Sequence, residues 1–460
     1  MSRTLCRRML QKKRYCIQIN LDELKECVTF AFAKVSQMTK QLSMQIKRDI
    51  YLNRLIERRH NHRIKIVSGV RRGGKTYLLF TLFSEWLQQN GISGEQIIKI
   101  NLEDRRNKDL RDPDRLLEYI DSKIRGQAMH YVLIDEIQHV AEFEDVLNSY
   151  LQMPNVDVYV TGSNAKFLSK DVITTFRGRG DEVRVWPLKF SEYCSAFTRS
   201  NEENLLAYLH YGGLPETIDM STEEAKTIFL KNVFEETYLR DIKERYKIKH
   251  DGELEILFDI VSSTVGSLTN PKKLANTFDS IKGCDLSDVT IKRYLDIICE
   301  SFLMEKAARY DVKGKRYIDT PYKYYFVDSG LRNARLNFRQ PDYSHVMENI
   351  IYNELRVRGF NVDVGVVPAV IRDKNGKQIR KQYEIDFVCN LGSKRYYIQS
   401  AWRMESEAKI EQEEHSLRSV DDSFKKIIVL GEPTPIYRNE AGITTMSIYD
   451  FLLKENSLEL

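Results

Sequence analysis

The feature that most constrains the fold is a glycine-rich loop set between an apolar run and a helical pattern. Residues 69–76 read Gly-Val-Arg-Arg-Gly-Gly-Lys-Thr and fit the pattern G-x-x-x-x-G-K-[ST]. A β-rich run at 64–67 comes directly before the loop, and the apolar residues of 77–89 recur after it at helical spacing. This order of strand, loop and helix predicts a phosphate-binding loop in a parallel α/β sheet.

The chemistry of this loop predicts its ligands. Glycines let successive backbone N–H groups turn toward phosphate oxygens, and the helix N-terminus adds partial positive charge. We expect Lys75 to reach the β- and γ-phosphates of ATP, and Thr76 to offer its hydroxyl to Mg²⁺. The predicted nucleotide-binding residues are Gly69, Arg72, Gly73, Gly74, Lys75 and Thr76.

Two acidic residues support the same site. Residues 131–134 form a continuous apolar run, as expected of a strand buried on both faces, and Asp135 and Glu136 follow it directly. We expect Asp135 to hold Mg²⁺ and Glu136 to orient or deprotonate the attacking water.

Two further catalytic candidates each have a plain structural alternative. Ser163 or Asn164, after a strand at 156–161, could touch the γ-phosphate or its water, or serve only as a turn residue. Arg179, before a strand at 183–186, could act as an arginine finger on a neighbouring subunit's phosphate, or form an ordinary salt bridge.

At these positions the chain resembles the AAA-type ATP-binding proteins of bacteria and archaea, in which a module of unknown function follows the ATPase. The resemblance is carried by residues 69–76, 134–136, 161–164, 178–179 and 187–188, and further along by residues 211–216, 238–242 and 326–331. It implies a P-loop core, then a winged-helix-like region, and then a restriction-endonuclease-like fold.

The domain organisation follows from this resemblance and from the alternation of strands and helices, which predicts a parallel sheet covered on both faces. We expect an AAA-like P-loop ATPase domain over 44–200 and a helical and winged-helix-like region over 201–335. A small restriction-endonuclease-like α/β domain is expected over 336–460. Residues 1–43 fall outside the resemblance, and Met44 is a candidate for the native start.

The implied C-terminal fold raises the question of nuclease chemistry. A PD-(D/E)xK centre needs a Glu on a helix, an Asp on a strand, and an acid and a Lys on the next strand. Glu348, Asp386 and Gln399 fit the first three places, but Ala401 stands where the Lys is required. We predict a degenerate nuclease-like site used for binding or assembly; an active nuclease and an unrelated domain stay open as alternatives.

Positive charge is concentrated locally. The whole chain carries a net charge of +5, yet a cluster of Lys and Arg interleaved with Tyr lies in 270–325. Such a surface could meet DNA phosphates, or be a solvated basic face, or pair with a protein. Asn270 and either Ser287 or Asp288 are expected to cap helices there. The basic residues are Lys272, Lys273, Lys292, Arg293, Lys306, Arg309, Lys313, Lys315, Arg316 and Lys323.

The remaining composition narrows the setting. No apolar run approaches the ~20 residues that a membrane span needs, so no membrane partner is expected. The seven cysteines are scattered without a CxxC pair, which favours reduced thiols and a cytoplasmic protein.

The function favoured by the sequence is Mg²⁺-dependent ATP hydrolysis that rearranges a C-terminal binding module. A nucleotide-controlled switch with slow turnover and a DNA-binding or DNA-processing factor are the alternatives. A homo-oligomer and an unidentified protein partner fit any of these functions.

Overall fold

A computed structural model describes residues 45–162, 178–248, 251–282, 286–339, 342–372, 378–404 and 407–460. The chain divides into two compact units, residues 1–47 and 48–460, and the second carries the fold described below. In the part of the chain that the structure describes, no helix is both long and apolar enough to cross a membrane.

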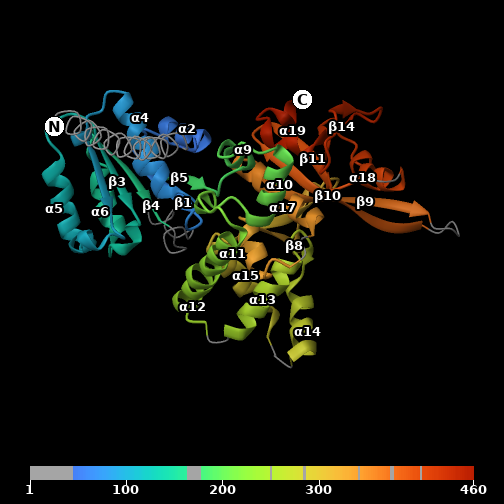
Figure 1. The fold of residues 1–460 in the computed structure, drawn as a ribbon. Helices are drawn as coiled ribbons and strands as arrows, with labels where there is room; N and C mark the ends of the chain where they lie inside the picture. Colours follow the sequence, from blue (N-terminus) through green and yellow to red (C-terminus); the bar gives the residue numbers. More distant parts are fainter. Residues whose placement is uncertain are drawn as a thin grey trace, which may run out of the picture. The chain divides into compact units, whose positions relative to one another are not determined.

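The first part of the second unit is built on a five-stranded sheet in the order β2-β3-β4-β1-β5 (Figure 1, blue to green). All neighbouring strands are parallel, as predicted. The strands are β1 (Ile64–Gly69), β2 (Ile97–Asn101), β3 (His130–Asp135), β4 (Val156–Thr161) and β5 (Gly180–Val185).

Helices cover both faces of this sheet, which confirms the predicted architecture. Along β3, Tyr131 and Leu133 belong to one apolar cluster, while Val132 and Ile134 belong to another, because successive side chains point to opposite faces. The first cluster also holds residues of α2 (Asp49–Glu57) and of the segment formed by α3 (Lys75–Tyr77), η1 (Leu78–Phe83) and α4 (Ser84–Gln89). The second holds residues of α5 (Pro113–Lys123) and α6 (Phe143–Tyr150).

A helical region follows the sheet. Its main helices are α9 (Phe190–Ser195), α10 (Asn201–Tyr211), α11 (Glu223–Asn232), η6 (Val233–Leu239), α12 (Arg240–Tyr246), α13 (Asp251–Ser263), α14 (Pro271–Lys282) and α15 (Asp288–Glu300). The predicted caps are present: Asn270 accepts from the backbone N–H of Lys272 at 2.9 Å, and Ser287 accepts from that of Thr290 at 3.2 Å.

The strands of the C-terminal half form one mixed sheet in the order β13-β14-β12-β11-β10-β9-β7-β8-β6. The hairpin of β7 and β8 pairs with the C-terminal strands, because β7 runs parallel to β9 with Arg309 opposite Val364. One sheet therefore joins the hairpin to the C-terminal α/β segment. The strands are β6 (Leu268–Thr269), β7 (Met304–Asp311), β8 (Arg316–Phe326), β9 (Asn361–Arg372), β10 (Gln378–Leu391), β11 (Lys394–Ala401), β12 (Lys425–Leu430), β13 (Tyr437–Arg438) and β14 (Ile443–Ser447).

The helices described beside this sheet include α16 (Ser329–Arg335), α17 (Tyr343–Val357), α18 (Glu407–Arg418) and α19 (Ile448–Leu453). The strands predicted at 384–388 and 395–399 lie within β10 and β11, and the helix predicted at 348–355 lies within α17.

Candidate nucleotide site

The glycine loop leaves the carboxyl end of β1 and enters the helix that begins at Lys75. Gly69 has φ +130°, and a Cβ at this position would lie 2.0 Å from the carbonyl oxygen of Val185. Gly74 also has a positive φ, of +88°. Both positions therefore need glycine, because other residues rarely adopt such a backbone conformation. At position 69 a side chain would also clash with Val185 of β5.

Lys75 points back into the loop. Its Nζ donates hydrogen bonds to the carbonyl oxygens of Gly69, at 3.0 Å, and Val70, at 2.9 Å. Burial lowers the pKa of Lys75 to about 8, and the nearby carboxylates of Glu136 and Asp135 oppose this shift. A buried ammonium group held by two carbonyl oxygens is well placed to gain from an arriving phosphate.

Asp135 joins the loop to two strands. Its carboxylate accepts from the hydroxyl of Thr76 at 3.0 Å and from that of Thr161, at the end of β4, at 2.5 Å. Burial raises the pKa of Asp135, while its bond from Thr161 opposes the shift. A hydroxyl and a carboxylate side by side are oxygen ligands of the kind that Mg²⁺ prefers, so the predicted metal residues fit that ion.

Glu136 turns away from the strand in a left-handed backbone conformation, with φ 55°. Its backbone N–H donates to the hydroxyl of Thr161 at 3.0 Å, and its carboxylate accepts from the side-chain amide of Gln138. Thr161 therefore sets the positions of both acids, a role that the sequence did not indicate.

The structure separates the other two catalytic candidates. Asn164, like Ser163, lies outside the described residues. Arg179 is exposed just before β5, and its carbonyl oxygen accepts from the N–H of Ile64 at 2.9 Å. Arg179 thus lies at the start of β1, whereas the loop follows the end of that six-residue strand, roughly 20 Å away at about 3.3 Å per residue.

Arg48, the residue before α2, contacts the backbone of the loop. The sequence did not indicate this role. Its guanidinium donates to the carbonyl oxygens of Gly73, at 3.1 Å, and Trp186, at 2.6 Å. It also lies 3.2 Å from the carboxylate of Glu192, with both side chains buried. A single Arg before a helix gives no signal of this role, because its partners are far away in the sequence.

Two motifs of the helical region also contact the loop. The hydroxyl of Tyr238 donates to the carbonyl oxygen of Arg71 at 3.1 Å, and Asp241 lies 3.6 Å from the Arg71 guanidinium. Glu216 pairs with Arg72 at 2.6 Å. These residues belong to the segments 211–216 and 238–242 that carried the family resemblance, but their sequence did not indicate a contact with the loop.

Asp328 fixes the segment that precedes Glu216. Its buried carboxylate accepts from the backbone N–H groups of Gly213, at 2.7 Å, and Leu331, at 3.0 Å. Burial raises the pKa of Asp328 to about 6, although hydrogen bonds from the backbone N–H groups of Gly213, Leu331 and Gly330 oppose this shift. One side chain therefore joins the start of α16 to the turn that leads to the nucleotide loop.

The nuclease-like residues also meet in the structure. The backbone N–H of Asp386 donates to the Gln399 side chain at 3.3 Å. The ammonium group of Lys323 lies next to the carboxylates of both Asp386 and Glu348 of α17, and so connects them. Lys323 comes from β8 and was expected on the basic surface. That expectation is wrong, because only 3% of Lys323 is exposed and its Nζ faces carboxylates.

Comparisons with known proteins identify the family of the chain. A family model described as "AAA domain" matches residues 61–194, and one described as "Domain of unknown function (DUF8612)" matches residues 202–342. An uncharacterized protein of Haemophilus influenzae is 34% identical over 418 residues, which cover 89% of this chain and 99% of that one. The chain belongs to this family of AAA-domain proteins. An uncharacterized protein of Methanocaldococcus jannaschii is 27% identical over 87% of both chains.

The matches to solved structures are distant. The Aeropyrum pernix ORC1 protein in complex with DNA covers 64% of this chain and 93% of its own, at 12% identity and a TM-score of 0.30. A Vibrio cholerae protein covers 79% of this chain and 97% of its own, at 11% identity and a TM-score of 0.20. The family membership therefore rests on the sequence matches: this is a P-loop ATPase of the AAA type followed by a domain of unknown function.

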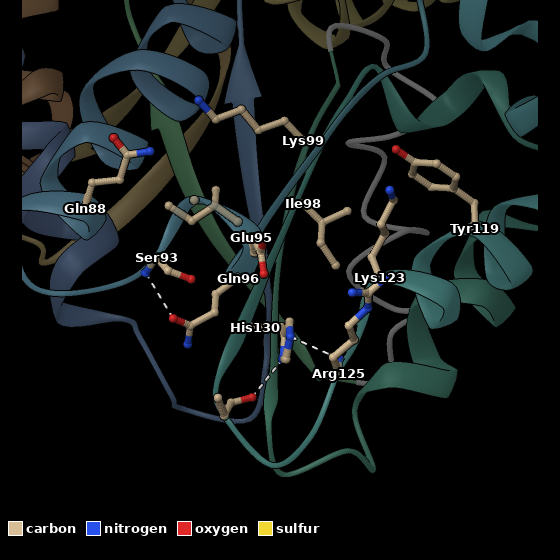
Figure 2. Close-up of a pocket in the computed structure, with 13 residues that line it drawn as sticks. Gln88, Ser93, Glu95, Gln96, Ile98, Lys99, Tyr119, Lys123, Arg125 and His130 are labelled. Carbon is tan, nitrogen blue, oxygen red and sulfur yellow. Dashed lines mark hydrogen bonds between the residues drawn. The ribbon is translucent and has the colours of Figure 1, made fainter.

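A pocket of the AAA domain lies at the other end of its sheet. Figure 2 shows it at the start of β2 and β3, where the ring of His130 accepts from the backbone N–H of Arg125 at 3.2 Å. The strands are parallel, so this edge is opposite to the one that carries the loop and Asp135. None of the predicted nucleotide-site residues lines it.

Proposed function

We propose that this AAA protein binds MgATP in the loop of residues 69–76, hydrolyses it, and uses the change to rearrange its C-terminal module. The observation that carries the proposal is the network of Thr76, Asp135, Thr161 and Glu136 beside the loop lysine. Two hydroxyls, two acids and the ammonium group of Lys75 lie at the carboxyl ends of neighbouring strands, which is where ligands bind in such sheets.

Each residue has a stated role in this proposal. Backbone N–H groups of the loop and the Lys75 ammonium bind the phosphates, while Glu136 orients water and accepts its proton. Thr76 and Asp135 would hold Mg²⁺, which neutralises phosphate charge when bound. Asn164 is proposed to contact the γ-phosphate or the water. Arg179 is proposed to act on the nucleotide of a neighbouring copy, since it lies far from its own loop.

ATP turnover by the Glu136→Gln variant tests hydrolysis. Without a base, turnover should fall by about 10²- to 10⁴-fold while ATP binding is retained. Glu142→Gln, in the exposed segment that follows, is the matched control and should leave turnover unchanged. Lys75→Ala should lose ATP binding. Equal turnover of the wild type and Glu136→Gln would contradict hydrolysis and favour a nucleotide-controlled switch.

The proposed coupling rests on the contacts behind the loop. Tyr238, Asp241 and Glu216 contact Arg71 and Arg72 of the loop, so a loop that closes on phosphates must move or strain these contacts. The exposed pair of Arg72 and Glu216 contributes little by itself. The bond from Tyr238 is the stronger link, because the side chain is buried in the helical region.

Hydrogen exchange in the Glu136→Gln protein tests this link. ATP should slow exchange in peptides covering residues 211–217 and 236–246. Tyr238→Phe should remove much of that response while ATP still binds. Tyr246→Phe is the control, since its hydroxyl donates to Glu300 at 2.9 Å, away from the loop. An ATP response that Tyr238→Phe leaves intact would contradict coupling through this contact.

A second proposal is that the module contacts DNA. The exposed cations described on α14 and α15 include Lys272, Lys273, Lys292 and Arg293. If they neutralise phosphates, the logarithm of the affinity should fall linearly with the logarithm of salt concentration. Anisotropy titrations with duplex DNA measure this slope. A slope that the Lys292→Ala/Arg293→Ala double variant does not reduce would contradict the proposal.

A further inference from the structure

A buried cluster of charged side chains lies where the sequence predicted a degenerate nuclease centre. Glu348 of α17 and Asp386 of β10 are each less than 10% exposed. The carboxylate of Glu384, also on β10, forms an ion pair with Lys323 in the same cluster. In a nuclease of the implied fold these acids would bind a divalent metal ion.

The centre of the cluster is the ammonium group of Lys323. Its Nζ lies 2.9 Å from Glu348, 2.8 Å from Glu384 and 3.7 Å from Asp386. Burial lowers the pKa of Lys323, but the three carboxylates outweigh burial and raise it above its usual value. The lysine therefore stays charged and cannot act as a base near neutral pH.

Two of these carboxylates also accept hydrogen bonds from other groups of the protein. Tyr325 donates to Glu348 at 2.7 Å, and the backbone N–H and hydroxyl of Ser400 donate to Asp386 at 2.8 and 2.9 Å. The turn at Gly266 packs over Glu348, since a Cβ at this glycine would lie 3.2 Å from that carboxylate. Glu348 and Asp386 are therefore buried and hydrogen-bonded within the protein, whereas the side chain of Glu384 is 36% exposed.

These residues do not fit a metal ion. Within the described ranges, no group of three or more His, Cys, Asp or Glu is arranged to hold one. The ammonium group of Lys323 lies between the three carboxylates, in the position where a metal ion would bind. We propose that Lys323 replaces the metal ion as a permanent internal cation, which closes the nuclease-like site and ties the β7–β8 hairpin to α17 and β10.

Mn²⁺ titration of the nucleotide-free protein and its melting temperature test the proposal. Wild type and Asp386→Asn should bind the same number of Mn²⁺ ions. Lys323→Met should lower the melting temperature by roughly 10 °C, because it leaves buried carboxylates without their cation. That variant should also gain one Mn²⁺ ion and recover part of the lost temperature. The double variant Lys323→Met/Asp386→Asn should gain none.

Lys306→Met is the matched control, because Lys306 is an exposed lysine of the neighbouring strand β7. It should change neither Mn²⁺ binding nor the melting temperature by a comparable amount. A folded Lys323→Met that gains no Mn²⁺ would overturn the proposal. If that variant does not fold, measurements on the wild type still test the proposal. The proposal is overturned if the wild type binds one more Mn²⁺ ion than Asp386→Asn does. It is also overturned if the wild type cleaves plasmid DNA with Mg²⁺ and Asp386→Asn abolishes that cleavage.

Discussion

Replacing Asp328 by Asn should destabilise the protein in a way that depends on pH. Both carboxylate oxygens of Asp328 accept backbone N–H groups, one from Gly213 and one from Leu331. An Asn side chain offers one acceptor oxygen and presents an NH₂ group to the other N–H. One buried donor then loses its partner, at a cost of about 1–3 kcal/mol.

The pH dependence follows from the raised pKa of Asp328. This carboxyl has a pKa of 3.8 ordinarily and about 6 in the folded protein, so the folded state binds its proton more tightly than the unfolded chain does. The resulting stabilisation is complete below about pH 4 and is lost as the pH rises through about 6. Between about pH 5 and 7.5 the wild type should lose ~1.4 kcal/mol from this group.

Asn does not titrate, so the stability difference between wild type and Asp328→Asn should shrink by that amount over the same range. Urea denaturation followed by circular dichroism at several pH values measures it. Asp112→Asn, at the exposed cap of α5, is a matched control that removes a capping carboxylate from the surface. A difference that stays constant or grows with pH would refute the burial of an ionising Asp328.

Two other substitutions test the nucleotide site. Thr161→Val should cost about 1–3 kcal/mol in unfolding free energy and lower ATP turnover at least tenfold, because it removes the hydroxyl that positions both acids; unchanged turnover would contradict this role. Arg48→Met should cost about 3–5 kcal/mol, since it leaves the Glu192 carboxylate buried and unpaired, and should weaken ATP binding. If Arg48→Met loses no more stability than the exposed control Arg63→Met, the buried ion pair of Arg48 and Glu192 does not stabilise the fold as proposed.

The parts of the fold that sequence predicted are those determined by neighbouring residues. The loop of 69–76 and the acids after 131–134 could be found because the strand, turn and helix signals that mark them are adjacent in the sequence. The caps at Asn270 and Ser287 are local for the same reason. Parallel order followed from the alternation of strands and helices, which requires crossover connections.

The interactions that sequence missed join distant segments. Arg48 reaches the carbonyl oxygen of Trp186, 138 residues away, and Tyr238 reaches Arg71, 167 residues away. Lys323 looked like one more surface cation, because nothing near it in the chain shows that Glu348 and Asp386 surround it. Ala401 predicted that β11 supplies no lysine to this cluster, but a pattern tied to one strand could not show that Lys323 of β8 lies among the carboxylates.

The continuous sheet of the C-terminal half affects how this chain can be divided. A fragment beginning near residue 336 would lack β7, the parallel neighbour of β9. The edge of β9 would then present unpaired N–H and C=O groups flanked by apolar side chains, which is a template for edge-to-edge aggregation. The fragment would also lack Lys323 and would carry buried acids without their cation. Soluble fragments should therefore keep the hairpin together with the strands that follow it.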